Sequence, residues 1–173
     1  MTLNAWLKKT LPALAQTLAK SVSCQAGTNT NRRFNLAGQK AVHAVRDELL
    51  GILFPGCHGL TPLREDRLEA ELARRIRAAA GALAEQAEQA YRYQCAFEKC
   101  RECGDCGRRA QDAVIALVQA LPEIRSLLQC DTQAAYDGDP AARSLMEIVL
   151  SYPGLQAIAT HRIAHVLYGQ GVP

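Results

Sequence analysis

A run of apolar residues at three- and four-residue steps is the feature that most restricts how this chain can fold. Charged residues stand between the members of the run, which are Leu68, Leu72, Ile76, Ala79, Leu83, Ala87 and Tyr91. Such spacing places the apolar side chains on one face of an α-helix. The sequence therefore predicts a long helix over roughly residues 64 to 94.

Shorter stretches on both sides of this run repeat the spacing. One stops at Phe54-Pro55-Gly56, where proline and glycine end regular structure. Another stretch contains Pro122. We interpret Pro122 as the first residue of a new helix, because the first helical position does not need the backbone N–H that proline lacks. The apolar members are Val42, Val45, Leu49, Ile52 and Leu53 in the first stretch, Val114, Leu117, Val118 and Leu121 before Pro122, and Ile124, Leu127 and Leu128 after it.

The composition supports an all-α domain. Hydrophobic residues make up 49% of the chain but aromatic residues only 5%, and the apolar residues are mostly alanine and leucine. This balance favours helices packed closely through small side chains. A length of 173 residues suits one domain with a core of its own.

The N-terminal residues differ from the rest. An apolar stripe of Leu3, Leu7, Leu11, Leu14, Leu18 and Val22 predicts an amphipathic helix or arm at residues 1–22, which Pro12 kinks or restarts. Residues 23–39 are polar, contain glycine and asparagine, and are typical of a linker. We expect the helical domain to occupy residues 40–173.

The net charge and the pattern of apolar residues restrict which binding partners and which cellular compartment we expect for this chain. The net charge of +3 is too small to indicate a nucleic-acid or membrane partner. Arg74, Arg75 and Arg77 share the long helix with glutamates, which predicts a solvated face. Lysines at 8, 9 and 20 interrupt the first apolar stretch, and no later run approaches the roughly 18 residues of a membrane span. We expect a soluble, cytoplasmic chain whose seven cysteines are thiols.

Asp139 lies in the acidic turn Asp-Gly-Asp-Pro at residues 137–140. Aspartate followed by proline is typical of a helix start, because the carboxylate caps the first turn and proline fits position N1. We therefore expect Asp139 to be at least a helix cap. A second break at Ser151-Tyr152-Pro153-Gly154 predicts another helix up to Gly169.

Several short strings of this region resemble the serine O-acetyltransferase family in order and spacing. They are DPAA at the acidic turn, YPG at the second break, RIAH at 162–165 and the final GVP. The resemblance continues upstream through ILFPG at 52–56 and LPEIRSLLQCDTQAAYDGDPA at 121–141, and it covers roughly residues 40 to 173. It implies the multi-helix N-terminal domain that precedes the left-handed β-helix of that family.

The resemblance implies transfer of an acetyl group from acetyl-CoA to L-serine, a step of cysteine biosynthesis. In that family the catalytic His–Asp pair and the acetyl-CoA site belong to the β-helix, which is built from hexapeptide repeats. No such repeats follow Pro173 in this chain, so we expect the catalytic β-helix to be absent and the chain alone to be inactive. Asp139 matches the family aspartate that helps to hold serine, or the feedback inhibitor cysteine, by the ammonium or hydroxyl group.

The family also implies partners. Its members are trimers through the β-helix, and two trimers dock through their helical domains, so we expect a homo-oligomer. Binding of O-acetylserine sulfhydrylase is expected only where a C-terminal tail is present.

Four of the seven cysteines lie within residues 95–107, CAFEKCRECGDCG. Cys100, Cys103 and Cys106 have two residues between neighbours, and Cys95 would be the fourth ligand of a metal ion, with zinc ahead of an iron–sulfur cluster. Reduced thiols in a loop between helices are the alternative. The same cluster supports a second function hypothesis, a free-standing helical assembly or metal-binding module without acetyltransferase activity.

Overall fold

The computed structural model describes residues 8–10, 12–17, 20, 39–58, 65–98 and 104–173, and it divides the chain into two compact units at residues 35 and 36. In the first unit, residues 8–10 and 12–17 are helical, and the Thr17 hydroxyl donates to the Ala13 carbonyl at 2.9 Å. Most of the predicted arm at 1–22, and the predicted linker at 23–39 except Gln39, lie outside the described residues. The division into arm, linker and domain stays a prediction.

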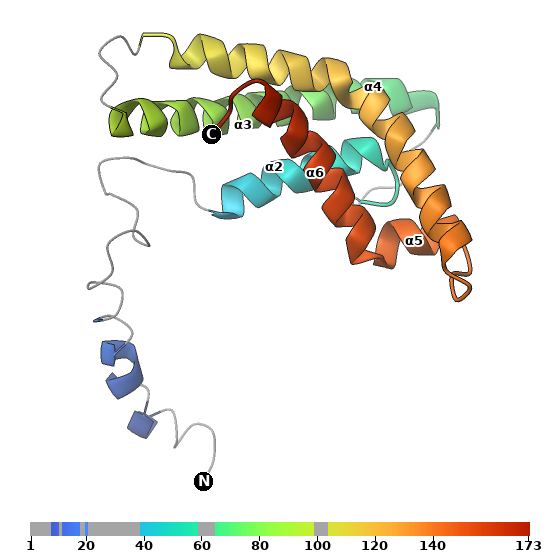
Figure 1. Cartoon of the computed structure of the whole chain (residues 1–173), viewed down its shortest axis with the longest axis horizontal. Helices are drawn as coiled ribbons and strands as arrows, with labels where there is room; N and C mark the ends of the chain where they lie inside the picture. The colour runs from blue at the N-terminus through green and yellow to red at the C-terminus, as the bar shows by residue number, and fades with distance from the viewer. Residues whose placement is uncertain (1–7, 11, 18–19, 21–38, 59–64, 99–103) are drawn as a thin grey trace. The chain divides into compact units, whose positions relative to one another are not determined.

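The second unit is a bundle of helices, and no strand occurs among its described residues (Figure 1), which confirms the predicted all-α class. Its elements are α2 (Gln39–Leu53), the short 3-10 helix η1 (Glu65–Arg67), α3 (Leu68–Phe97), α4 (Cys106–Gly138), α5 (Leu145–Ser151) and α6 (Pro153–Gly169). The predicted long helix corresponds to α3. The predicted stop at Phe54-Pro55-Gly56 is confirmed, and Gly56 adopts the left-handed φ of 86° that this turn requires.

Helix α4 corrects the prediction that Pro122 begins a new helix. It runs without interruption from Cys106 to Gly138 with Pro122 inside. Its second half turns away from the line of the first (Figure 1), as expected where proline removes one backbone hydrogen bond and crowds the preceding turn. Buried side chains before and after the proline hold both halves in the bundle, and they are Leu117, Leu121, Ile124 and Leu128.

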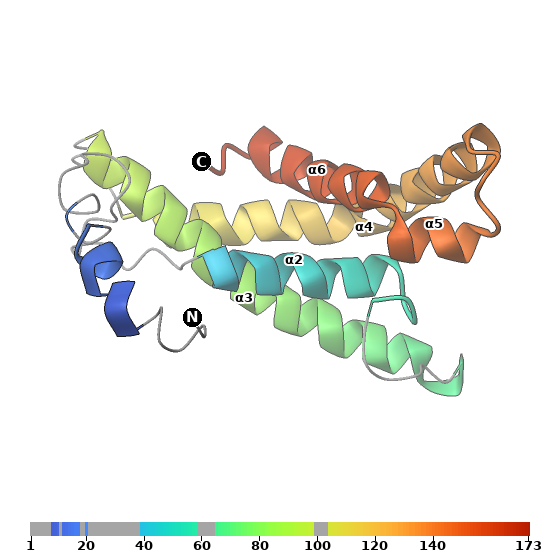
Figure 2. The ribbon, with the colours of Figure 1, turned by 90° about the horizontal axis from the view of Figure 1, so that it is seen from below.

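The main core lies between α2, α3, α4 and α6, with α5 closing one end (Figure 2). Its fully buried side chains include Leu53, Leu117, Leu128 and Ile148. By length and composition α4 also resembles a membrane-spanning helix. However, α4 packs against α3, α5 and α6 and contributes several buried residues to the core, which is the position of a central helix in a bundle.

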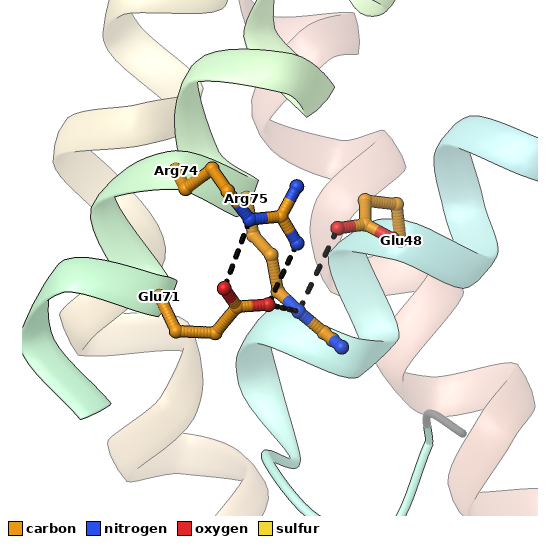
Figure 3. A network of polar contacts seen from close by, with 4 residues as sticks. All are labelled: Glu48, Glu71, Arg74 and Arg75. Atoms are coloured by element: carbon orange, nitrogen blue, oxygen red, sulfur yellow. Dashed lines mark hydrogen bonds and ion pairs between the residues drawn. The ribbon is translucent and has the colours of Figure 1, made fainter. Parts of the chain in front are cut away.

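Arg75 corrects the prediction of a solvated arginine face. Its side chain is only 10% exposed, and its Nε lies 3.0 Å from Glu71 of the same helix and 3.9 Å from Glu48 of α2 (Figure 3). Arg74 remains at the surface and pairs with Glu71. The hydrogen bonds from Arg74 and Arg75 lower the pKa of Glu71 to about 2. Helical spacing is consistent with this difference, because Arg75 stands three residues after Leu72 and four before Ala79 and so borders the apolar face, where packing against α2 buries it.

Candidate functional site

Asp139 lies in the turn between α4 and α5, and its position corrects the expected helix cap. No helix begins at Pro140: α4 ends at Gly138, and α5 begins at Leu145. Ser144 is the N-cap instead, accepting from the Glu147 backbone N–H at 3.1 Å. The acidic stretch therefore forms a tight turn that joins two helices, not the first turn of one.

The Asp139 carboxylate organises this turn through both oxygens. Oδ1 accepts a hydrogen bond from the Ala141 backbone N–H at 2.9 Å, the pattern of an Asx-turn. The Asp139 carbonyl accepts from the Ala142 N–H at 3.0 Å, which closes the β-turn. Oδ2 accepts from the Tyr152 hydroxyl at 2.5 Å. Asp139 thus links the end of α4 to the residue that immediately precedes α6.

These hydrogen bonds determine the protonation states of Asp139 and Tyr152 at neutral pH. The hydrogen bond from Tyr152, and then the one from the Ala141 backbone, hold the pKa of Asp139 below its usual range. The same carboxylate raises the pKa of Tyr152 to about 12. At neutral pH the site is therefore an ionised carboxylate beside a neutral phenol, and Asp139 is a weak base.

The carboxylate retains capacity for a ligand. Its two oxygens offer about four acceptor positions, of which the described side-chain contacts use two. Asp139 is half-buried, and no lysine, arginine or histidine of the described residues lies within ion-pair distance of it. A half-buried negative charge with open acceptor positions and no countercharge among the described residues can accept an ammonium group.

Tyr152 is the site residue that sequence reasoning missed. In the YPG string it only marks a break, whereas in the structure it is the N-cap residue of α6, directly before Pro153. Its partner lies 13 residues earlier in the chain. The available signal is an acidic turn followed, 13 residues after Asp139, by a tyrosine at the next helix break.

The predicted cysteine cluster is described only in part. Cys95 lies in the last turns of α3 and Cys106 begins α4, with 3.6 Å between their Sγ atoms. Cys100 and Cys103 lie outside the described residues. Within the described part of the chain, no three His, Cys, Asp or Glu side chains gather as a metal-binding group.

The fold and the turn together define a helical domain in which an ionised carboxylate is held between the end of α4 and the start of α6. Residues 38–160 match the family model described as "Serine acetyltransferase, N-terminal". The matched range includes α2 to α5, Asp139 and Tyr152, and covers more than half of the chain. The chain belongs to the serine acetyltransferase family, as its sequence strings indicated.

Known relatives agree with this membership. The plasmid-encoded serine acetyltransferase of Synechococcus elongatus is 53% identical over 66 residues, which are 38% of this chain and 21% of that protein. Serine acetyltransferase isoform 3 of Entamoeba histolytica, solved in complex with cysteine, matches with a TM-score of 0.60 and 26% identity over 95% of this chain and 52% of that chain.

Serine acetyltransferase 1 of the same organism, in complex with L-cysteine, matches with a TM-score of 0.57 and 30% identity over 73% of this chain and 41% of that chain. The chain thus spans about a fifth of the curated relative and about half of the solved structures. The family match favours the acetyltransferase interpretation over a free-standing helical module.

Proposed function

We propose that this chain is the helical part of a serine O-acetyltransferase, which transfers the acetyl group of acetyl-CoA to the hydroxyl of L-serine. The observation that carries the proposal is the family match over residues 38–160, which contains the turn of Asp139 and Tyr152. Acetyl-CoA is then a co-substrate of the complete enzyme, and the product feeds cysteine biosynthesis. We expect this enzyme to work in the cytoplasm.

Asp139 holds the ammonium group of L-serine in this proposal. Support comes from its ionised state, its open acceptor positions and the lack of a cation beside it among the described residues. L-Cysteine carries the same ammonium group, and the two solved relatives contain cysteine. The same carboxylate therefore binds cysteine as a feedback inhibitor, in competition with serine.

Asp139 orients the substrate and does not remove its proton. A carboxylate whose pKa lies below the usual range is a poor general base near neutral pH. By the family resemblance, the base and the acetyl-CoA site belong to a β-helix domain. We therefore expect this chain alone to fold without catalysing acetyl transfer.

Serine-dependent release of CoA tests the assignment of the activity. The 173-residue chain alone should give no release above a blank without protein. The same chain joined to a hexapeptide-repeat domain of the family should give release that requires serine. No activity in the joined protein, or full activity in the chain alone, would contradict the proposal.

Self-association is the second part of the proposal. Large apolar side chains remain exposed on α4, α5 and α6, and they are Ile115, Leu127, Leu145, Met146, Leu150 and Ile158. Such surface favours contact between copies of the chain. Analytical ultracentrifugation should show an oligomer, and a monomer at high concentration would count against it. O-Acetylserine sulfhydrylase joins this assembly only where a C-terminal tail is present.

A further inference from the structure

The Cys95 and Cys106 thiols meet where two long helices pack together. Cys95 lies near the end of α3 and is half-buried, while Cys106 is the first residue of α4 and is only 4% exposed. Their Sγ atoms are 3.6 Å apart. Helices α3 and α4 lie side by side at this end in both views of the ribbon (Figures 1 and 2). The fold thus brings together two thiols that are 11 residues apart in the chain.

This separation is small enough for a covalent bond between the two sulfurs. The sulfurs of a disulfide are about 2.05 Å apart, so the pair has to close by about 1.5 Å. Both residues lie at helix ends, where fewer backbone hydrogen bonds hold the chain than in the middle of a helix. Rotation of the two side chains, with a small shift of the helix ends, therefore allows the bond to form.

We propose that Cys95 and Cys106 form a reversible disulfide when the protein meets a hydroperoxide, and that this bond fastens the end of α3 to the start of α4. Cys95 reacts first, because its sulfur is the more accessible of the two. Its S–O bond forms as the O–O bond of the peroxide breaks, and the thiol proton leaves with the alcohol or water that is released.

Cys106 completes the reaction. Its sulfur attacks the sulfur of the Cys95 sulfenic acid, the S–S bond forms as the S–O bond breaks, and the Cys106 proton leaves in a second molecule, water. The two thiols lose two electrons, and the hydroperoxide gains them. An outside thiol can later attack the half-buried Cys95 sulfur and restore both thiols. Such transient disulfides are the kind that cytosolic proteins use as redox sensors.

The bond lies in a small core that also holds the residues after α6. The Tyr91 hydroxyl of this core donates to the Gln170 carbonyl at 3.0 Å. The buried members of the core are Ala87, Tyr91, Cys106 and Ala110, and Cys95 and Val172 pack against them. A bond between Cys95 and Cys106 therefore stabilises the surface on which Gln170 and Val172 are held.

Peptide mapping of the full chain tests the pairing. The protein is treated with hydrogen peroxide, its remaining thiols are alkylated, and it is digested with trypsin and endoproteinase Asp-N. These enzymes place Cys95 in peptide 93–99 and Cys106 in peptide 105–108, each with one cysteine. We expect these two peptides to be joined in most of the protein in which Cys95 is oxidised to a disulfide. Reduction with dithiothreitol before alkylation should separate them.

The same treatment in urea shows whether the fold selects the pair. In the unfolded chain Cys95 can react with any of the other six cysteines, so the share of its bond to Cys106 should fall to roughly a sixth if the loops close equally well. Equal shares in the folded and unfolded protein would overturn the proposal, as would a folded protein in which Cys95 is joined mainly to another cysteine.

Cys95→Ser and Cys130→Ser are the matched variants, because Cys130 is exposed on α4. Oxidation should raise the urea midpoint of the unchanged chain and of Cys130→Ser, and should leave that of Cys95→Ser unchanged. Amide hydrogen exchange should slow in the same two proteins at Gly171 and Val172, whose N–H groups donate to the Tyr168 and Leu167 carbonyls at 2.8 and 3.1 Å. The proposal is overturned if oxidation changes neither quantity, or if it changes both equally in Cys95→Ser.

Discussion

The Tyr152 hydroxyl donates a 2.5 Å hydrogen bond to Oδ2 of Asp139, and it joins the residue before α6 to the turn after α4. This contact orients the carboxylate while leaving it charged, because the phenol remains protonated up to a pKa of about 12. The proposed binding of an ammonium group depends on that combination of fixed direction and negative charge.

Removing the Tyr152 hydroxyl should raise the pKa of Asp139. In Tyr152→Phe the carboxylate loses the hydrogen bond that contributes most to its lowered pKa, so the value should return toward the ordinary aspartate range of about 3.9. Carbon-13 NMR titration of the carboxyl group measures this directly. Tyr168→Phe is the control, since Tyr168 is 78% exposed on α6. An equal pKa in the two variants would contradict the assigned cause.

The same contact predicts how stability depends on pH. The folded-state pKa of Asp139 lies below its unfolded value, so its stabilisation is present above the unfolded pKa and is lost as pH falls through the folded one. The folded-state pKa of Tyr152 is raised, so the contribution of its hydrogen bond to stability is lost as the pH rises through about 12. Urea unfolding at several pH values should show the Asp139 loss weakened and the Tyr152 loss absent in Tyr152→Phe.

A side chain at Gly51 should disturb the contact between α2 and Arg75. A Cβ built there would lie 2.6 Å from the His58 carbonyl oxygen and 2.8 Å from Nη1 of Arg75. We expect Gly51→Ala to destabilise the fold by about 1–3 kcal/mol, because a backbone atom has to shift. The midpoint of urea unfolding should fall with an unchanged slope.

Gly81 provides the matched control within α3. A Cβ at Gly81 would meet nothing within 4 Å, so alanine should stabilise the helix by about 0.5–1 kcal/mol. Opposite signs for the two glycine variants are the expected outcome. A loss of stability at Gly81 as large as that at Gly51 would show that close approach to the His58 carbonyl and Arg75 is not the cause.

The two faces of α4 should respond differently to truncation. Leu117 is fully buried and Ile115 is 55% exposed, two positions earlier on the same helix. Leu117→Ala should cost about 2–5 kcal/mol and Ile115→Ala within about 0.5 kcal/mol. Chemical unfolding measures both changes. Similar costs at the two positions would contradict the place of α4 at the centre of the bundle.

The sequence predicted what depends on local period and missed what depends on distant neighbours. The apolar steps from Leu68 to Tyr91 identified α3, because helical spacing is visible within a single segment. The prediction of a helix start at Pro122 is wrong, since the packing of Leu117 and Leu128 on either side outweighs the local cost of proline. The prediction of a solvated Arg75 is also wrong, because packing against α2 buries its side chain.

The candidate site is likewise predicted from the sequence only in part. The resemblance pointed to Asp139, while the local rule for aspartate before proline gave it the wrong structural role. Its partner Tyr152 could not be found from spacing, because α5 and its cap at Ser144 lie between the two residues. Hydrogen bonding across a turn has no fixed period in the sequence.

Asp139→Asn tests the proposed role of the carboxylate in an enzyme in which this chain is joined to a hexapeptide-repeat domain. Asparagine keeps an oxygen for the Ala141 N–H, and the Tyr152 hydroxyl can accept from its amide, so the turn should remain folded. The charge that pairs with the substrate ammonium is lost. Asp137→Asn is the matched control. Asp137 lies two residues earlier, is exposed, and accepts a hydrogen bond from the Gln133 side chain at 2.8 Å.

The most direct measurement of the central claim is the serine KM of these two variants, with acetyl-CoA and cysteine titrated separately. For Asp139→Asn we predict that the serine KM rises roughly 10- to 100-fold, that cysteine inhibition weakens in parallel and that the acetyl-CoA KM hardly changes. Asp137→Asn should behave as the unchanged enzyme. If Asp139→Asn keeps the serine and cysteine responses of Asp137→Asn, the carboxylate only organises the turn and the proposed ammonium site is wrong.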